Sequence, residues 1–224
     1  MLCRDDTELA ESWLDGALAR FTADNDDLVL QTRSLLAAIV ADTPRHARLA
    51  NTLSMLDHIG SHKIMATQHG ADIDQPTLKH VHEEAGHAYF MKRQAEKTAQ
   101  RPLEYVEGDL LAPASARMYF QRLEAAMLRT LPQQRSARAV YLYMSMIVEF
   151  RALWFYGLYQ QTLERARHPL SLKRVLGEEQ NHLGDVAHRL ETAGELSDAR
   201  TTELVRHEKA LFGRLLAAMQ RAVA

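Results

Sequence analysis

The stretch EEAGH at residues 83–87 has a counterpart, EEQNH, at residues 178–182, and this repeat decides how the chain is expected to fold. In each stretch the second glutamate and the histidine lie three positions apart, so on a helix they share one face. These residues are Glu84 with His87 and Glu179 with His182. The intervals from 84 to 179 and from 87 to 182 both measure 95 positions. One such pair is a weak motif, but the common register indicates a repeated helical unit.

Both pairs lie among apolar residues at helical spacing. The face with Glu179 also carries Val175, Leu176, Leu183, Val186 and Leu190, and the face with Glu84 carries Val81, Ala88, Met91 and Ala95. An ionised carboxylate that is buried without a partner costs several kcal/mol. A bound cation would remove that cost, so we interpret both pairs as metal ligands. The alternative is an ordinary polar pair on a partly exposed helix face.

A lone acid in an apolar helix is a further candidate ligand. Residues 140–159 are almost all apolar or aromatic, yet Glu149 and Arg151 lie at their centre. Two charges in that position disfavour a membrane span. We therefore predict the most buried helix of a bundle, with no membrane contact and with Glu149 as a metal ligand.

The last ligand is expected in residues 45–69, where Asp57 is the only acid. It shares a helix face with Ala50, Leu53, Ser54, Gly60, Ser61 and Ile64. We therefore predict Asp57 as a ligand. His58 and His62 are spaced four apart and remain alternatives, since such a pair can bind a metal by itself.

Four more polar residues flank the predicted ligands. His80 and His82 could extend a metal cluster, but we expect them to be surface histidines. Glu83 and Glu178 precede the two buried glutamates. We expect these two to be solvent-exposed or to support the site from outside, with exposure favoured.

Long periodic runs, with only 10 glycines and 6 prolines, predict an all-α chain. Helices are expected at about residues 7–21, 27–41, 45–69, 76–100, 114–131, 133–167, 169–194 and 197–223. Pro76 and Pro169 are each expected to open a helix, because proline suits a first helical turn. Pro132 is expected to end one, and residues 70–75 to form a turn.

The order of these helices predicts a single domain spanning residues 1–224. Its core would be a four-helix bundle at about 45–194, in which a long crossover joins two helix pairs. Residues 1–44 and 195–224 would add helical extensions at the two ends.

Composition excludes several classes of protein. The net charge of -2 gives no indication of nucleic-acid binding. Cys3 is the only cysteine, which excludes an internal disulfide and a cysteine-based zinc or iron–sulfur site. Residues 1–6 turn acidic at once and show no secretory signal, so we expect a cytoplasmic protein.

The candidate residues resemble those of the ferritin-like di-iron and di-manganese carboxylate superfamily. In that family two helices each give a carboxylate and the other two each give Glu-x-x-His. The resemblance implies that the ligands are Asp57, Glu84, His87, Glu149, Glu179 and His182. It departs at Asp57, where the family usually has glutamate. It implies two bound iron ions, with manganese or a mixed Mn/Fe pair as alternatives.

The resemblance also implies a function. We expect a non-haem di-iron oxidoreductase that activates dioxygen to oxidise a small organic substrate, in a homodimer supplied with electrons by an external donor. One alternative is a peroxide-reducing or catalase-like enzyme of the same superfamily. Two others are an iron-binding or storage protein and a metal-free helical interaction module.

Overall fold

The computed structural model describes residues 4–68, 73–131 and 137–224 of the chain. This part contains helices and no strands, so the prediction of an all-α fold is confirmed. In chain order the elements are α1 (Arg4–Asp24), α2 (Asp26–Val40), α3 (Thr43–Ala66), α4 (Gln75–Ala99), the short 3₁₀ helix η1 (Glu107–Asp109), α5 (Pro113–Thr130), α6 (Ala137–Arg165), α7 (Lys173–Thr192) and α8 (Asp198–Val223).

Several helix starts follow from local sequence. Asp74 caps α4 by accepting a hydrogen bond from the backbone N–H of Thr77, and Pro76 lies in the first turn as predicted. Ser197 caps α8 in the same way. The predictions for residues 69–72 and for the break at Pro132 lie outside the described residues.

The predicted start of α7 at Pro169 is wrong, since the helix begins at Lys173. The preceding backbone is held by side chains instead of by a helical turn. The N–H of Leu170 donates to His168 Nδ1 at 3.1 Å, and the N–H of Leu172 donates to Gln160 Oε1 of α6 at 2.6 Å. These contacts satisfy two backbone donors that would otherwise be left without a partner.

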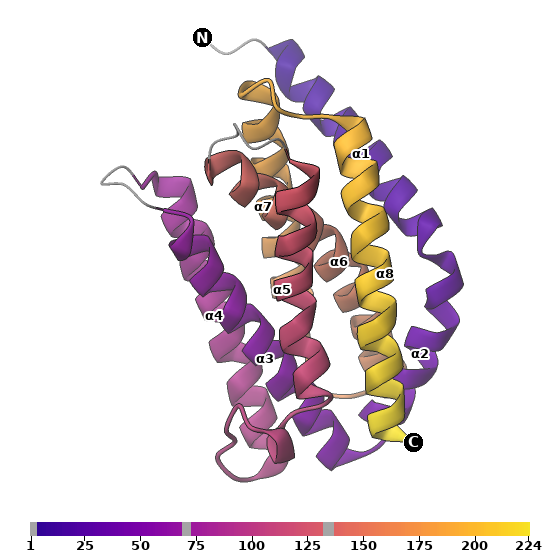
Figure 1. The fold of residues 1–224 in the computed structure, drawn as a ribbon. Coiled ribbons are helices and arrows are strands. Elements are labelled where there is room, and N and C mark those ends of the chain that lie inside the picture. Colours follow the sequence, from indigo (N-terminus) through magenta and orange to yellow (C-terminus); the bar gives the residue numbers. More distant parts are fainter. Residues whose placement is uncertain (1–3, 69–72, 132–136) are drawn as a thin grey trace.

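Two helix pairs form the centre of the molecule. α3 runs alongside α4, and α6 runs alongside α7, while α4 also contacts α7 (Figure 1). These helices contribute fully buried apolar side chains to one hydrophobic core, among them Leu49, Met91, Tyr143, Phe150 and Val186. Inward-facing residues of α3, α4, α6 and α7 therefore meet in one interior.

The remaining helices cover this centre. α5 and α8 pack against each other, and α2 lies against α6 (Figure 1). A buried ion pair joins α6 to α8, with Arg151 Nη2 2.7 Å from Glu208 Oε2. In the described ranges, no helix is long and apolar enough to cross a bilayer.

Candidate metal centre

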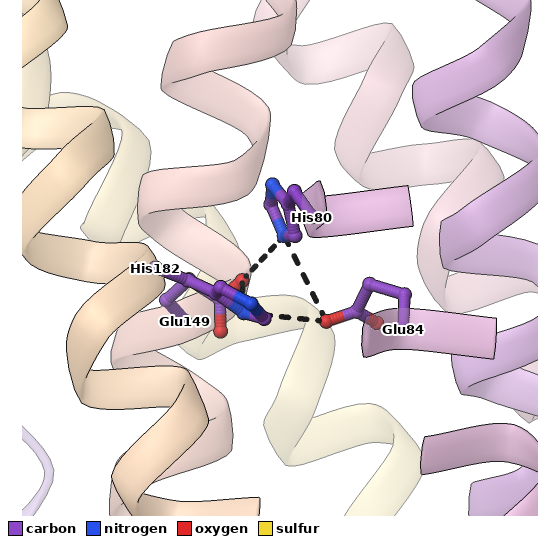
Figure 2. A group of neighbouring side chains, drawn as sticks. All are labelled: His80, Glu84, Glu149 and His182. Carbon is purple, nitrogen blue, oxygen red and sulfur yellow. Dashed lines mark hydrogen bonds and ion pairs between the residues drawn. The ribbon is translucent and has the colours of Figure 1, made fainter. Parts of the chain in front are cut away.

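Three helices bring two histidines and two glutamates together in the interior. His80 and Glu84 come from α4, Glu149 from α6 and His182 from α7 (Figure 2). One ligand-type atom from each of the four lies within 4.8 Å of the others, and all four residues are buried. His80 Nε2 is 3.2 Å from Glu149 Oε1, and His182 Nδ1 is 3.7 Å from Glu84 Oε1. This four-residue group could hold a metal ion.

A second group adjoins the first and shares Glu84 with it. It consists of Glu84, His87 and Glu179, again with ligand-type atoms within 4.8 Å of one another. His87 Nδ1 lies 3.4 Å from Glu179 Oε1 and 3.8 Å from Glu84 Oε1. Glu84 thus stands between two places where a cation could bind.

The structure brings five of the six predicted residues into these two groups. The sixth, Asp57 of α3, lies beside them, in neither group. One of its oxygens, Oδ1, accepts a hydrogen bond from Tyr156 at 3.2 Å. The other, Oδ2, is buried and has no hydrogen-bond partner. His58 and His62, the alternatives to Asp57, are exposed and belong to neither group, so the structure leaves Asp57 as the acid that α3 offers here.

His80 is a member that the sequence analysis assigned wrongly. It was expected on the surface, but the residue is only 5% exposed. Its Nε2 faces Glu149, while its Nδ1 lies 2.9 Å from the hydroxyl of Tyr141. The signal was present in the spacing, because His80 precedes Glu84 by four residues and therefore shares its helix face. His82 is exposed, as expected.

The first glutamate of each EExxH stretch supports the histidine of the other. Glu83 of α4 lies 2.8 Å from His182 Nε2 of α7, and Glu178 of α7 lies 2.9 Å from His87 Nε2 of α4. Both glutamates are partly buried, so the expectation of exposure is wrong, and each contacts a predicted ligand from outside the two groups. These bonds fix both imidazole rings with Nδ1 towards the cluster, as carboxylates do for metal-bound histidines.

The cluster concentrates charge in a poorly solvated space. Burial and the nearby charges of Glu179 and Glu149 raise the pKa of Glu84, and burial raises that of Asp57 to about 7. Burial alone would also raise the pKa of Glu149, but hydrogen bonds with His182 and His80 hold it at about 2.

The pKa values of His87 and His182 are raised, against the effect of burial, by neighbouring carboxylates. Burial alone would lower both pKa values, but the charge of the Glu179 carboxylate, 3.4 Å from Nδ1, helps to raise the pKa of His87 to about 9. Hydrogen bonds with Glu149 and Glu179 raise that of His182 to about 11. Without a cation, these imidazoles therefore carry the positive charge that balances the carboxylates.

Two buried atoms at the cluster lack hydrogen-bond partners, which a bound cation would replace. Asp57 Oδ2 and His87 Nδ1 are both buried without a hydrogen-bond partner. An unpaired buried polar atom costs about 1–3 kcal/mol, and a metal ion would give each atom a partner. Arg151 does not fill that role for Glu149, since its guanidinium pairs with Glu208.

A cavity reaches the cluster from one side. It lies between α3, α5 and α6 and has a volume of about 80 Å³. Asp57, Glu84, Glu149 and Glu179 form its inner end, and most of its wall is apolar. A small molecule in this cavity would therefore lie against carboxylates of both groups.

No family model, no curated protein and no solved structure matches the chain. The function must therefore be argued from the cluster and the cavity.

Proposed function

We propose that this protein is a di-metal oxidoreductase with a ferritin-like bundle, which binds two iron ions and uses dioxygen to oxidise a small organic substrate. One observation carries the proposal: two buried groups of metal-ligand type share the carboxylate of Glu84. Shared carboxylates are the means by which such bundles hold two ions side by side.

The arrangement of helices supports the ferritin-like assignment. The pairs α3/α4 and α6/α7 are separated in the chain by residues 100–136, which include α5. α4 and α7 carry the Glu-x-x-His pairs, and α3 and α6 carry the single acids Asp57 and Glu149. This is the distribution of donors that characterises the ferritin-like superfamily.

The two ions would differ in the kinds of ligand that hold them. One ion would be held by His80, Glu84, Glu149 and His182, and the other by Glu84, His87, Glu179 and the adjacent Asp57. Mixed imidazole and carboxylate donors suit iron, with manganese as the alternative. When bound, a pair of redox-active ions would supply the activation of dioxygen.

The surrounding residues would prepare the site for this chemistry. Glu83 and Glu178 orient the imidazoles of His182 and His87, and Tyr141 holds the outer nitrogen of His80. The apolar cavity favours an organic substrate over peroxide alone, because peroxide needs no apolar wall. Electrons would come from an external donor, since the sequence contains no Rossmann-type glycine fingerprint and no cysteine pair.

Metal analysis and a dioxygen trace test the proposal together. Protein purified without oxygen from iron-supplemented cells should contain about two transition-metal ions per chain, as the two ligand groups require. Chemical reduction followed by exposure to air should then consume dioxygen. Protein without tightly bound transition metal would overturn the proposal, and rapid peroxide consumption without an organic substrate would favour the peroxide-reducing alternative.

A further inference from the structure

The wall of the cavity beside the cluster is built for apolar contact. α3 contributes Leu56 and Ile64, α5 contributes Phe120 and Met127, and α6 contributes Met144 and Val148. A charged group within this wall would lose its water without gaining a partner. The part of a ligand that lies here must therefore be apolar.

Small side chains leave room where the cavity meets the cluster. Gly60 of α3 and Ala152 of α6 both line it. A Cβ atom added at Gly60 would lie 3.5 Å from Glu84 Oε2, so a longer side chain there would occupy the space beside that carboxylate.

One ion pair stands at the other end of the cavity. Lys63 of α3 and Glu124 of α5 both line it, and Lys63 Nζ lies 2.5 Å from Glu124 Oε2. Lys63 is the only lysine or arginine among the described residues of the lining. It follows Asp57 by six residues, so its Cα lies about 9 Å further along the axis of α3. The cavity thus runs from a charged outer end, over an apolar wall, to the cluster.

We infer that the cavity binds an apolar molecule with a terminal carboxylate, which replaces Glu124 as the partner of Lys63. The inference deepens the proposed function, on which it rests for the reaction but not for the binding. An anion fits better than a cation, because the Lys63 side chain is 27% exposed and that of Glu124 is 49% exposed. The lysine is therefore the better-buried partner, and the glutamate is the one that can turn towards solvent.

Three eight-carbon probes with different head groups separate the possible ligands. Octanoate, octylamine and 1-octanol would each be titrated into the purified full-length protein by calorimetry, with metal content measured on the same preparation. We expect octanoate to bind about tenfold more tightly than 1-octanol, the ratio that one charge-assisted hydrogen bond supplies. Octylamine should bind most weakly. Equal binding of all three, or no binding of octanoate, would overturn the inference.

Variants away from the proposed ligands connect this binding to the cavity. Lys63→Gln should remove the advantage of octanoate over 1-octanol, and Glu124→Gln should strengthen octanoate binding by freeing the lysine. Ala152→Phe should abolish binding of both probes by filling the cavity. Lys97→Gln, which changes an exposed lysine of α4, is the matched control. Octanoate binding that is unchanged in Lys63→Gln would also overturn the inference.

The two proposals can fail separately. Binding of octanoate requires the cavity and Lys63 but no metal, so it should persist in protein stripped by a chelator. If the protein lacks metal and still prefers octanoate, only the proposed function fails. If it holds two metal ions per chain and shows no preference for octanoate, only the present inference fails.

Discussion

Glu84 is the residue on which both ligand groups depend. Its neighbours divide between the groups, since Glu149 belongs to one and Glu179 to the other. A substitution should therefore have a different effect at each of these positions, although all three are buried glutamates.

Replacement of Glu84 should remove both ions, whereas replacement of Glu149 should remove one. Glu84→Gln should lower the metal content from about two ions per chain to almost none, because neither group keeps its shared carboxylate. Glu149→Gln should leave about one ion, held by the group that contains His87. Elemental analysis of the folded variants measures this, with Glu107→Gln at an exposed position as control. Equal loss from both variants would contradict the sharing of Glu84.

Glu178 should matter for affinity and not for the number of ions. Its carboxylate orients His87 from outside the cluster, and loss of such a partner weakens metal binding by about 10–100-fold. Glu178→Ala should therefore bind two ions per chain at saturation but release them to a weaker chelator. Competition titrations measure the change, and Glu83→Ala should act in the same way through His182. Unchanged affinity in both variants would show that the hydrogen bonds do not fix the histidines.

At the scale of helices, the attachment of α8 depends on buried charges. Arg151 of α6 donates from Nε and Nη2 to the two carboxylate oxygens of Glu208 on α8, which is fully buried. Tyr119 of α5 donates to the same carboxylate, and Arg151 also donates to Asn25 between α1 and α2. One ion pair therefore connects helices from both ends of the chain to the centre.

Removal of one partner of this pair should destabilise the protein strongly. Glu208→Gln should lower the free energy of unfolding by about 3–5 kcal/mol, because it leaves the Arg151 guanidinium buried without its counter-ion. Urea denaturation measures the loss, with Glu203→Gln on the exposed face of α8 as control.

The double variant Arg151→Met/Glu208→Leu should lose less than the single one, since it leaves no buried charge unpaired. A loss below about 1 kcal/mol for Glu208→Gln would mean that the pair is not buried as described.

At the scale of the whole molecule, a buried histidine connects stability to pH. His46 of α3 is hydrogen-bonded to Tyr159 of α6 and packs against His168, with ring centroids 4.6 Å apart. Burial, and to a lesser extent the proximity of His168, lowers the pKa of His46 from 6.5 to about 4. The folded protein therefore keeps this imidazole neutral at pH values where the unfolded chain protonates it.

Stability should consequently fall as the pH drops from 6.5 to 4. In this range the unfolded state binds one more proton at His46, so the free energy of unfolding should decrease by up to about 3 kcal/mol. Above pH 6.5 the His46 imidazole is neutral in both the folded and the unfolded state, so this loss of stability is absent. Urea denaturation at several pH values should show a shallower pH dependence for His46→Gln than for the unchanged protein. Parallel curves would contradict the lowered pKa.

The sequence alone predicted much of the cluster, and its errors have a physical cause. The helix period and the apolar faces were enough to place Glu84, Glu149 and Glu179 in the interior. The start of α7 was misplaced because Gln160, on another helix, accepts the N–H of Leu172. That contact joins two helices and leaves no trace in local spacing. The burial of His80, in contrast, was indicated by its position four residues before Glu84, on the same helix face.

The sequence by itself determined the all-helical fold, the inward faces of the helices and the register of the two EExxH stretches, because each follows from the 3.6-residue period of a single helix. Only the tertiary structure decided that Glu84 is shared, that Glu83 and Glu178 cross to the opposite histidines, and that Arg151 pairs with Glu208. These pairings join residues on different helices. They depend on how the helices pack, which local periodicity does not specify.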